Sequence, residues 1–182
     1  MRRAALCAAG LVFIWPIVCA AQPAAAPHAQ ATEDCVRFDP LLVSASNAAG
    51  GWKVVQGTTP ILDYGDDAAG AQRALDVIRH YHFTRQCFVR GPGAVMMYWK
   101  NGVAVPPGNM PGQDCIVFNP ANVAAQFSDT RWRVADGNNW LLDYGQDRAA
   151  ADQAAAVIHT YSLNRECFVE RPRVAMQYWL AQ

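Results

Sequence analysis

The chain has 182 residues, 52% of them hydrophobic, with 15 basic and 15 acidic side chains in balance. No cluster of basic residues follows Arg3, which argues against a nucleic-acid or anionic-membrane partner.

The first residues follow the pattern of an export signal. Two arginines at positions 2 and 3 precede an apolar stretch over 4–18, which is too short for a permanent anchor. We therefore expect a signal peptide over residues 1–21 and a secreted or periplasmic protein without an integral membrane segment after cleavage. A lipid anchor on Cys19 is the alternative, but bulky Val18 disfavours it. Loss of the two arginines leaves 13 basic against 15 acidic residues.

Residues 22–33 are rich in Ala, Pro and Gln and predict a flexible lead-in. Beyond them the chain repeats itself at a shift of 80 residues, because 34–99 aligns without a gap on 114–179 with 28 of 66 positions identical. We predict repeat domains at 34–100 and 114–182, joined by a Pro/Gly-rich linker over 101–113.

Short apolar runs within the first repeat predict strands, and the second repeat carries them at matching positions. In chain order these runs are Cys35–Phe38, Trp52–Val55, Ile61–Tyr64, Cys87–Val89 and Val95–Trp99.

One amphipathic helix is predicted between the third and fourth strands of each repeat. Its apolar residues follow helical spacing and would place one stripe against a sheet. Gly65 and Gly145 supply the turn into the helix, and Asp67 and Asp147 are suited to cap its first backbone N–H groups. The stripe consists of Ala71, Ala74, Leu75, Ile78 and Tyr81, and of Ala151, Ala154, Ala155, Ile158 and Tyr161.

The resulting fold class is α+β. We expect two tandem copies of a small βββαββ domain, each with a mainly antiparallel sheet covered by one helix. Such a short domain buries a limited core, so a covalent link within each copy would add needed stability.

Four cysteines remain after signal cleavage, and an even number in an exported chain indicates disulfides. The repeat favours Cys35–Cys87 with Cys115–Cys167, because each copy then closes by itself. The other symmetric option joins the copies, as Cys35–Cys115 with Cys87–Cys167. Zinc is disfavoured because no pair of cysteines has C-x-x-C spacing, and we expect no metal and no cofactor.

Asp63 and Asp143 are charged residues inside otherwise apolar strands, each followed by a tyrosine, Tyr64 or Tyr144. A carboxylate in such a strand must be paired, hydrogen-bonded or exposed. One interpretation is a structural ion pair with the repeated arginines, Arg85 and Arg165. The other is a polar anchor for ligand hydroxyls beside the two tyrosines.

Trp140 has no counterpart in the first repeat, where Pro60 occupies the matching position. It follows a predicted hairpin turn that includes Asp136, Asn138 and Asn139. A tryptophan beside such a turn is suited to stack on a sugar while the amides bind its hydroxyls. The alternative is that Trp140 covers an interface between the copies.

A catalytic set is not visible in the sequence. No histidine recurs at the same place in both repeats, so His80 and His82 are better explained as solvated residues near a helix end. Each repeat has one strand carboxylate, so a glycosidase-like pair would have to combine Asp63 with Asp143.

We therefore predict an exported, non-catalytic binding module that recognises extracellular or cell-wall glycans through two related sites, in which duplication would add avidity. A secreted factor that binds a protein, such as an inhibitor or an adhesin subunit, is the alternative. A hydrolase with its site between the copies is the third hypothesis.

Overall fold

The computed structural model describes residues 33–48, 50–90, 95–101, 110–170 and 174–182. The predicted signal peptide and nearly all of the lead-in lie outside these residues, as does most of the predicted linker.

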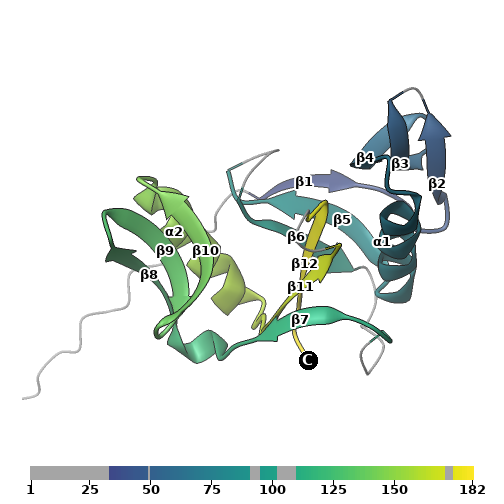
Figure 1. Ribbon diagram of the computed structural model, residues 1–182. Helices are drawn as coiled ribbons and strands as arrows, with labels where there is room; N and C mark the ends of the chain where they lie inside the picture. Colours follow the sequence, from purple (N-terminus) through teal and green to yellow (C-terminus); the bar gives the residue numbers. More distant parts are fainter. Residues whose placement is uncertain (1–32, 49, 91–94, 102–109, 171–173) are drawn as a thin grey trace, which may run out of the picture. The chain divides into compact units, whose positions relative to one another are not determined.

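Both repeats have the same order of regular elements, namely four strands, one helix and two strands (Figure 1). The first repeat contains β1 (Asp34–Arg37), β2 (Val43–Ala48), β3 (Gly51–Gln56), β4 (Thr59–Gly65), α1 (Ala68–His80), β5 (Phe83–Phe88) and β6 (Met97–Asn101). The second contains β7 (Asp114–Val117), β8 (Val123–Ser128), β9 (Arg131–Asp136), β10 (Asn139–Gly145), α2 (Arg148–Thr160), β11 (Arg165–Val169) and β12 (Met176–Leu180), with a short 3-10 helix over Pro120–Asn122 before β8.

The strands form four three-stranded sheets rather than one sheet for each repeat, and every described pairing is antiparallel. In each repeat the second, third and fourth strands, which precede the helix, form a meander. The first strand of the repeat instead pairs with the two strands after the helix. The four orders are β2-β3-β4, β8-β9-β10, β1-β5-β6 and β7-β11-β12.

Strands β2 and β8 are absent from the predicted order βββαββ, and that order is wrong by one strand. The sequence of β2, VSASNA, is poor in the β-branched and aromatic residues that indicate a strand. Its backbone pairs with β3 all the same, from Val43 opposite Gln56 to Ala48 opposite Gly51. Ladder hydrogen bonds are made by the backbone, so a polar edge strand gives little signal in its side chains.

Each disulfide links directly opposite residues of neighbouring antiparallel strands. Cys35 on β1 is bonded to Cys87 on β5, and Cys115 on β7 is bonded to Cys167 on β11. This is the pairing within each repeat that the sequence favours. It joins the first strand of a repeat to the strand after its helix.

The helices begin as their sequences predict. Gly65 and Gly145 have φ of +54° and +59°, values that favour glycine in the turn before the helix. Asp67 then accepts a hydrogen bond from the Gly70 backbone N–H at 2.8 Å, and Asp147 accepts one from Ala150 at 3.0 Å. Both aspartates therefore act as N-caps.

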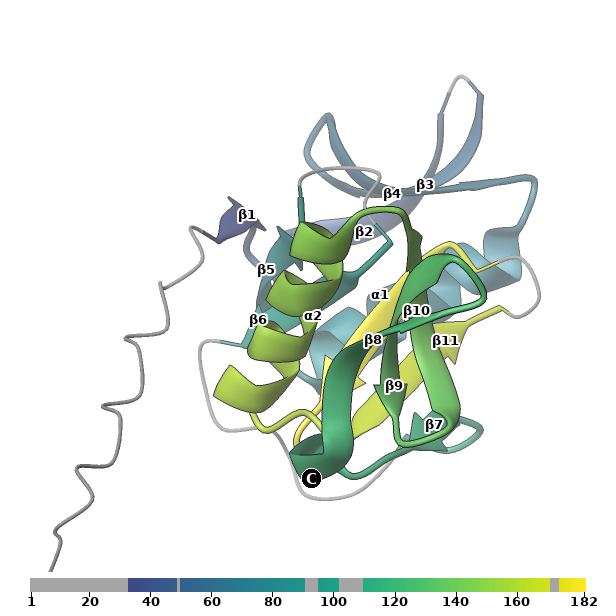
Figure 2. The same cartoon turned by 90° about the vertical axis from the view of Figure 1, so that its left-hand side faces the viewer.

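The buried surface of each helix is wider than the predicted stripe. Val77 and Val157 are also buried, on α1 and α2 respectively. Val77 adjoins β11 and β12 of the second repeat, since it lines a small cavity with Val169 and Tyr178. One side of α1 covers its own meander, and another side contacts a sheet of the other repeat. Figure 2 shows α2 lying across β8–β10.

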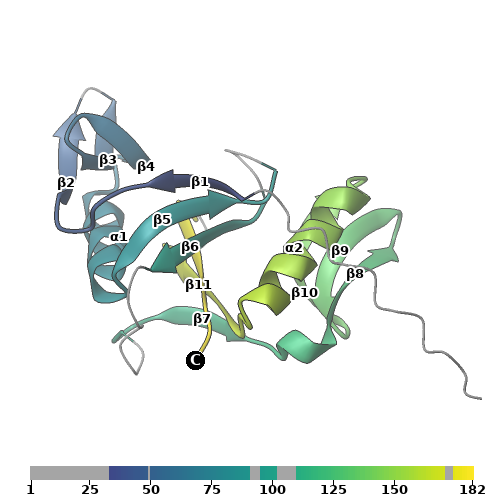
Figure 3. The same ribbon diagram turned by 180° about the vertical axis from the view of Figure 1, so that it is seen from behind.

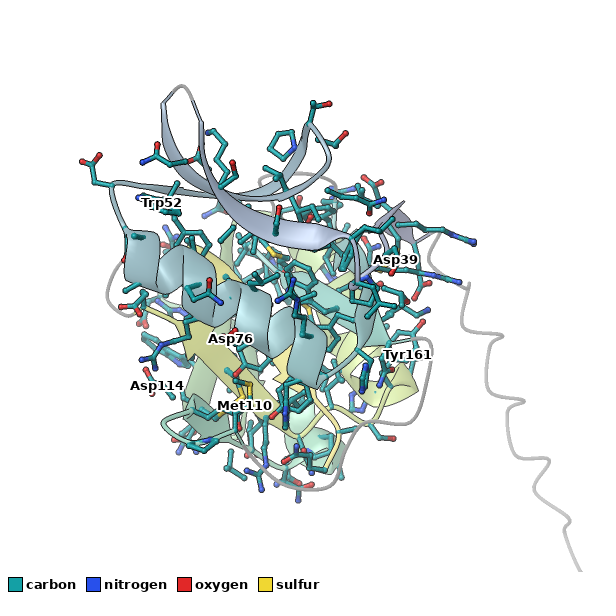
Figure 4. All side chains as sticks on the ribbon, turned by 90° about the vertical axis from the view of Figure 1, so that its right-hand side faces the viewer. Asp39, Trp52, Asp76, Met110, Asp114 and Tyr161 are labelled. Carbon is teal, nitrogen blue, oxygen red and sulfur yellow. A yellow bond between two sulfur atoms is a disulfide. The ribbon has the colours of Figure 1, made fainter. Side chains whose placement is uncertain are left out.

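Each hydrophobic core combines residues of both repeats. The first core contains α1 and the β2–β4 meander together with Cys167, Met176 and Tyr178 of the second repeat. The second core contains α2 and the β8–β10 meander together with Cys87 and Tyr98 of the first repeat. Trp52 and Met110 pack against the edge of the first core, around α1 (Figure 4).

The last strands of the two repeats, β6 and β12, lie next to each other in Figures 1 and 3 and are in contact. The Trp99 indole Nε1 donates to the Gln177 backbone carbonyl at 2.9 Å. The Met97 backbone N–H donates to the Gln177 side-chain oxygen at 3.4 Å. The two repeats are thus joined by polar contacts as well as by their cores.

Candidate binding surface

Asp63 and Asp143 lie on exposed faces of the two meanders, and their cations come from the neighbouring strand. Lys53 forms an ion pair with Asp63. Arg131 Nε lies 2.8 Å from an Asp143 carboxylate oxygen. The expected partners, Arg85 and Arg165, are not the cations at these carboxylates. The strand register instead places Lys53 opposite Asp63, and it places Arg133, two residues from Arg131, opposite Asp143.

Each aspartate also accepts a hydrogen bond from the glycine two residues later in the chain. The backbone N–H groups of Gly65 and Gly145 donate to Asp63 and Asp143 at 3.0 and 2.8 Å. The Lys53 hydrogen bond and then that of Gly65 lower the pKa of Asp63. Arg131 and then Gly145 do the same for the pKa of Asp143. Both groups are therefore held as carboxylates, which suits them poorly to act as general acids.

Tyr64 and Tyr144 lie on the opposite face from these aspartates, because alternate residues of a strand point to opposite sides. Their side chains are only 8% and 9% exposed and belong to the two cores. Burial is the main cause that raises the pKa of each phenol. A surface ligand beside Asp63 or Asp143 would not reach these rings.

Trp140 lies at the start of β10, and its side chain is 58% exposed. It pairs with Ala135 across the sheet, and a bulge then brings Leu142 opposite Val134. The bulge lets Trp140 lie on the outer face while Leu142 enters the core.

The Arg133 guanidinium lies under the Trp140 ring, with its central carbon 3.5 Å from the ring centroid. Arg133 is only 6% exposed. Its Nη1 donates to the Ser128 carbonyl at 3.2 Å, to the Ser128 hydroxyl at 2.8 Å and to Asp129 at 2.9 Å. The guanidinium is thus fixed in place, and it supports one face of the indole through a cation–π contact.

We call the surface formed by Arg131, Arg133, Trp140 and Asp143 the Trp140 face. Asp143 lies between its two arginines, since Arg133 Nε is 3.6 Å from the same carboxylate that Arg131 binds. The sequence indicated Trp140 and Asp143 but missed both arginines. Only the register of β9 against β10 brings these four side chains together.

The predicted hairpin turn is present, with Asp136 opposite Asn139 at its base. Asp136 accepts a hydrogen bond from the Asn119 backbone N–H at 2.9 Å, so it holds the segment after β7 against the turn. Asn138 and Asn139 are exposed and immediately precede Trp140. They are the polar groups of the turn that remain at the surface beside the indole.

The first repeat does not reproduce the Trp140 face. Pro60 stands in place of Trp140, Lys53 in place of Arg133 and Gly51 in place of Arg131. The expected second site would therefore have no aromatic ring at this position. A stacked tryptophan is specific to the second repeat.

Another exposed aromatic lies on the opposite side of the same meander. Phe127 is 57% exposed, and its ring centroid is 5.3 Å from that of Trp132 on the neighbouring strand. Arg148 at the start of α2 covers Trp132, with its guanidinium carbon 5.0 Å from the ring centroid. This pair continues the core-facing side of the sheet to its edge, away from the Trp140 face.

The histidines in the described ranges do not form a shared site. His82 is exposed beyond the end of α1, and His159 Nε2 is 2.9 Å from the Val123 carbonyl oxygen.

In the described part of the chain no group of three or more His, Cys, Asp or Glu residues is arranged to hold a metal ion. None of the described helices is long and apolar enough to cross a bilayer.

No protein-family model matches the chain, and neither a curated protein nor a solved structure matches it. The function is therefore inferred from the residues of the Trp140 face.

Proposed function

We propose that this protein is a non-catalytic binding module that takes a carbohydrate on the Trp140 face. The observation that carries the proposal is the indole of Trp140, which rests on an immobilised guanidinium and is more than half exposed. A rigid aromatic surface loses little conformational entropy on binding, and the apolar face of a sugar ring can stack on it.

Polar groups around the ring suit the hydroxyls of such a ligand. Asn138 and Asn139 offer amide donors and acceptors from the turn. Arg131 is half exposed beside Asp143, so this ion pair presents both a donor and an acceptor to solvent. The balanced charge of the pair favours a neutral, hydroxyl-rich ligand over a strongly anionic one.

We also propose that the protein is exported into an oxidising compartment. Its two disulfides suit such an environment, and the apolar N-terminal segment suits a cleavable signal. N-terminal sequencing of the natively expressed protein should find a start at about residue 21 or 22. A start at Met1 or a lipid on Cys19 would contradict this part of the proposal.

A glycan array followed by calorimetric titration tests the binding proposal. The wild-type protein should bind a subset of neutral glycans, and Trp140→Ala should weaken that binding at least about fivefold, since loss of an aromatic platform removes about 1 kcal/mol or more. Phe127→Ala is the matched control, because it removes another exposed aromatic of the same meander and should leave affinity unchanged. Absence of binding by the wild-type protein, or equal affinity of Trp140→Ala, would overturn the proposal.

A further inference from the structure

A second polar cluster joins residues of the two repeats and shares no residue with the Trp140 face. It consists of Glu33, which directly precedes the first repeat, Tyr98 and Lys100 of β6, and Tyr161, which follows α2. Tyr161 is labelled in Figure 4. Tyr98 donates its hydroxyl to Glu33 Oε1 at 3.2 Å, and Lys100 Nζ lies 2.8 Å from Glu33 Oε2. The Tyr161 hydroxyl also donates to Glu33 Oε1 and accepts from Lys100 at 2.7 Å. Both carboxylate oxygens are thus bound.

The groups that surround the Glu33 carboxylate are held by the fold. Tyr98 is 2% exposed and belongs to the second core, and Lys100 lies on the same strand, β6. Lys100 Nζ also lies 4.6 Å from the centroid of the Tyr161 ring. Burial by itself would raise the pKa of Glu33, but the hydrogen bonds from Lys100 and the two tyrosines outweigh it and lower that pKa. The cluster therefore favours a negative charge at this point.

The chain contains a neutral version of the same arrangement at the positions 80 residues away. Gln113 corresponds to Glu33, and its Nε2 lies 2.9 Å from the Tyr178 hydroxyl and also bonds the Tyr81 hydroxyl. The two tyrosine pairs match closely, with ring centroids 5.9 Å apart for Tyr81 and Tyr178 and 6.0 Å apart for Tyr98 and Tyr161. Leu180 corresponds to Lys100. Hence both clusters contain a tyrosine pair. The cluster with a carboxylate, Glu33, also has a lysine, whereas the cluster with the neutral Gln113 has a leucine at that position.

Glu33 itself lies outside the sheets, since β1 begins at Asp34. Removal of its side chain from the cluster breaks no bond of the β1–β5 ladder. Two of the three donors lie on β6 and the third, Tyr161, directly follows α2, so all three would stay in place.

We propose that Tyr98, Lys100 and Tyr161 form a carboxylate-binding site that Glu33 fills from within the chain. An external carboxylate competes for the same donors, at a disadvantage set by the high effective concentration of a tethered group. The ligand class is a carboxylate on a small molecule, an acidic sugar or a peptide C-terminus. This site is separate from the Trp140 face and does not depend on the proposed sugar binding.

Rescue of a Glu33 variant by acetate tests this proposal. Glu33→Ala should gain thermal stability with sodium acetate in a saturable way, by about 3 °C at ten times the dissociation constant, whereas wild-type protein should gain much less. Sodium chloride at equal ionic strength controls for screening. Two further ligands then separate the sources of the carboxylate: glucuronate represents an acidic sugar, and N-acetylglycine represents a peptide C-terminus. The uncharged analogue N-acetylglycinamide should give no shift in melting temperature.

Two further variants make the outcome specific. Glu33→Ala combined with Lys100→Leu installs the residue of the neutral cluster and should abolish the acetate response. Gln113→Ala, the matching deletion in the neutral cluster, should show no acetate-specific gain. If Glu33→Ala does not fold, Glu33→Ser, whose short side chain leaves the donors open, replaces it, with the Lys100 side-chain NMR shifts as the readout. A Glu33 variant without an acetate-specific response, or an equal response without Lys100, would overturn the site.

Discussion

At the scale of single residues, positions that are equivalent in the two repeats carry different chemistry on the same backbone. Lys53 and Arg133 occupy matching sites, and both lie beside a strand aspartate. A guanidinium is planar and can donate in several directions at once while its face stacks on a ring, whereas an ammonium cannot stack in this way. Arg133 does both, with bonds to Ser128 and Asp129 and with Trp140 above it. The difference between Lys53 and Arg133 is thus one of three that accompany the aromatic face, together with those at Arg131 and Trp140.

Several carboxylates in the chain should make stability depend on acid pH. Hydrogen bonds and ion pairs lower the pKa of Asp63, Asp143 and Asp147 from the ordinary 3.8, and that of Glu33 from 4.5. A lowered folded-state pKa means that the unfolded chain binds protons more readily, so the contribution is complete above the ordinary values and is lost as pH falls through the folded-state values. Urea denaturation should show a constant free energy of unfolding above about pH 5 and a decline below about pH 4.

Glu33→Gln should flatten part of this acid decline, because the amide cannot lose a charge. Asp66→Asn, which also removes one exposed negative charge, is the control. An equally steep decline in Glu33→Gln and the wild-type protein would contradict the role given to the Glu33 carboxylate.

At the scale of elements, each helix has two buried sides, and this explains the width of its apolar surface. An amphipathic helix that covers one sheet needs a single stripe. On α1 the additional buried residue Val77 meets the β11–β12 sheet, which belongs to the other repeat. The disulfide-bonded strand β11 thereby serves as the second wall for α1, and Cys87 of β5 joins the core around α2.

The two disulfides should contribute about equally to stability. Each closes a loop of 52 residues, for which the chain-entropy description gives about 4 kcal/mol. The paired changes Cys35→Ala/Cys87→Ala and Cys115→Ala/Cys167→Ala should each lower the free energy of unfolding by roughly this amount in denaturant titrations. A loss below about 1 kcal/mol for either pair would show that the loop constraint is not what stabilises that repeat.

At the scale of the whole described structure, both hydrophobic cores need residues from both repeats. Cys167 and Tyr178 complete the core around α1, while Cys87 and Tyr98 complete the core around α2. Unfolding of one repeat would expose apolar surface of the other. We therefore expect one cooperative unfolding transition rather than two.

A cleaved chain tests this interdependence. With a protease site inserted between residues 101 and 110, the two halves should stay associated after cleavage and elute together in size-exclusion chromatography under native conditions. Neither half alone should show cooperative unfolding, because each lacks part of both cores. Separation of two folded halves without denaturant would contradict the shared cores.

Local signals were enough to predict several features of this protein. The shift of 80 residues defined the repeat, and the spacing of apolar residues predicted both helices and their caps. The Gly-Asn turn before Trp140 predicted a hairpin. Each of these signals lies within a short stretch of the chain or in the similarity between its two halves, and so the amino-acid sequence alone reveals it.

The sequence by itself therefore determined the repeat, the helices and the preference for disulfides within each repeat. Only the tertiary structure decided that β2 and β8 join the meanders, that each helix packs against the other repeat, and that Arg131 and Arg133 meet Asp143 beside Trp140. The physical reason is that strand pairing and core contacts depend on backbone register and on residues far apart in the chain. A one-residue change of register would turn Arg133 to the opposite face, and no local pattern specifies that register alone.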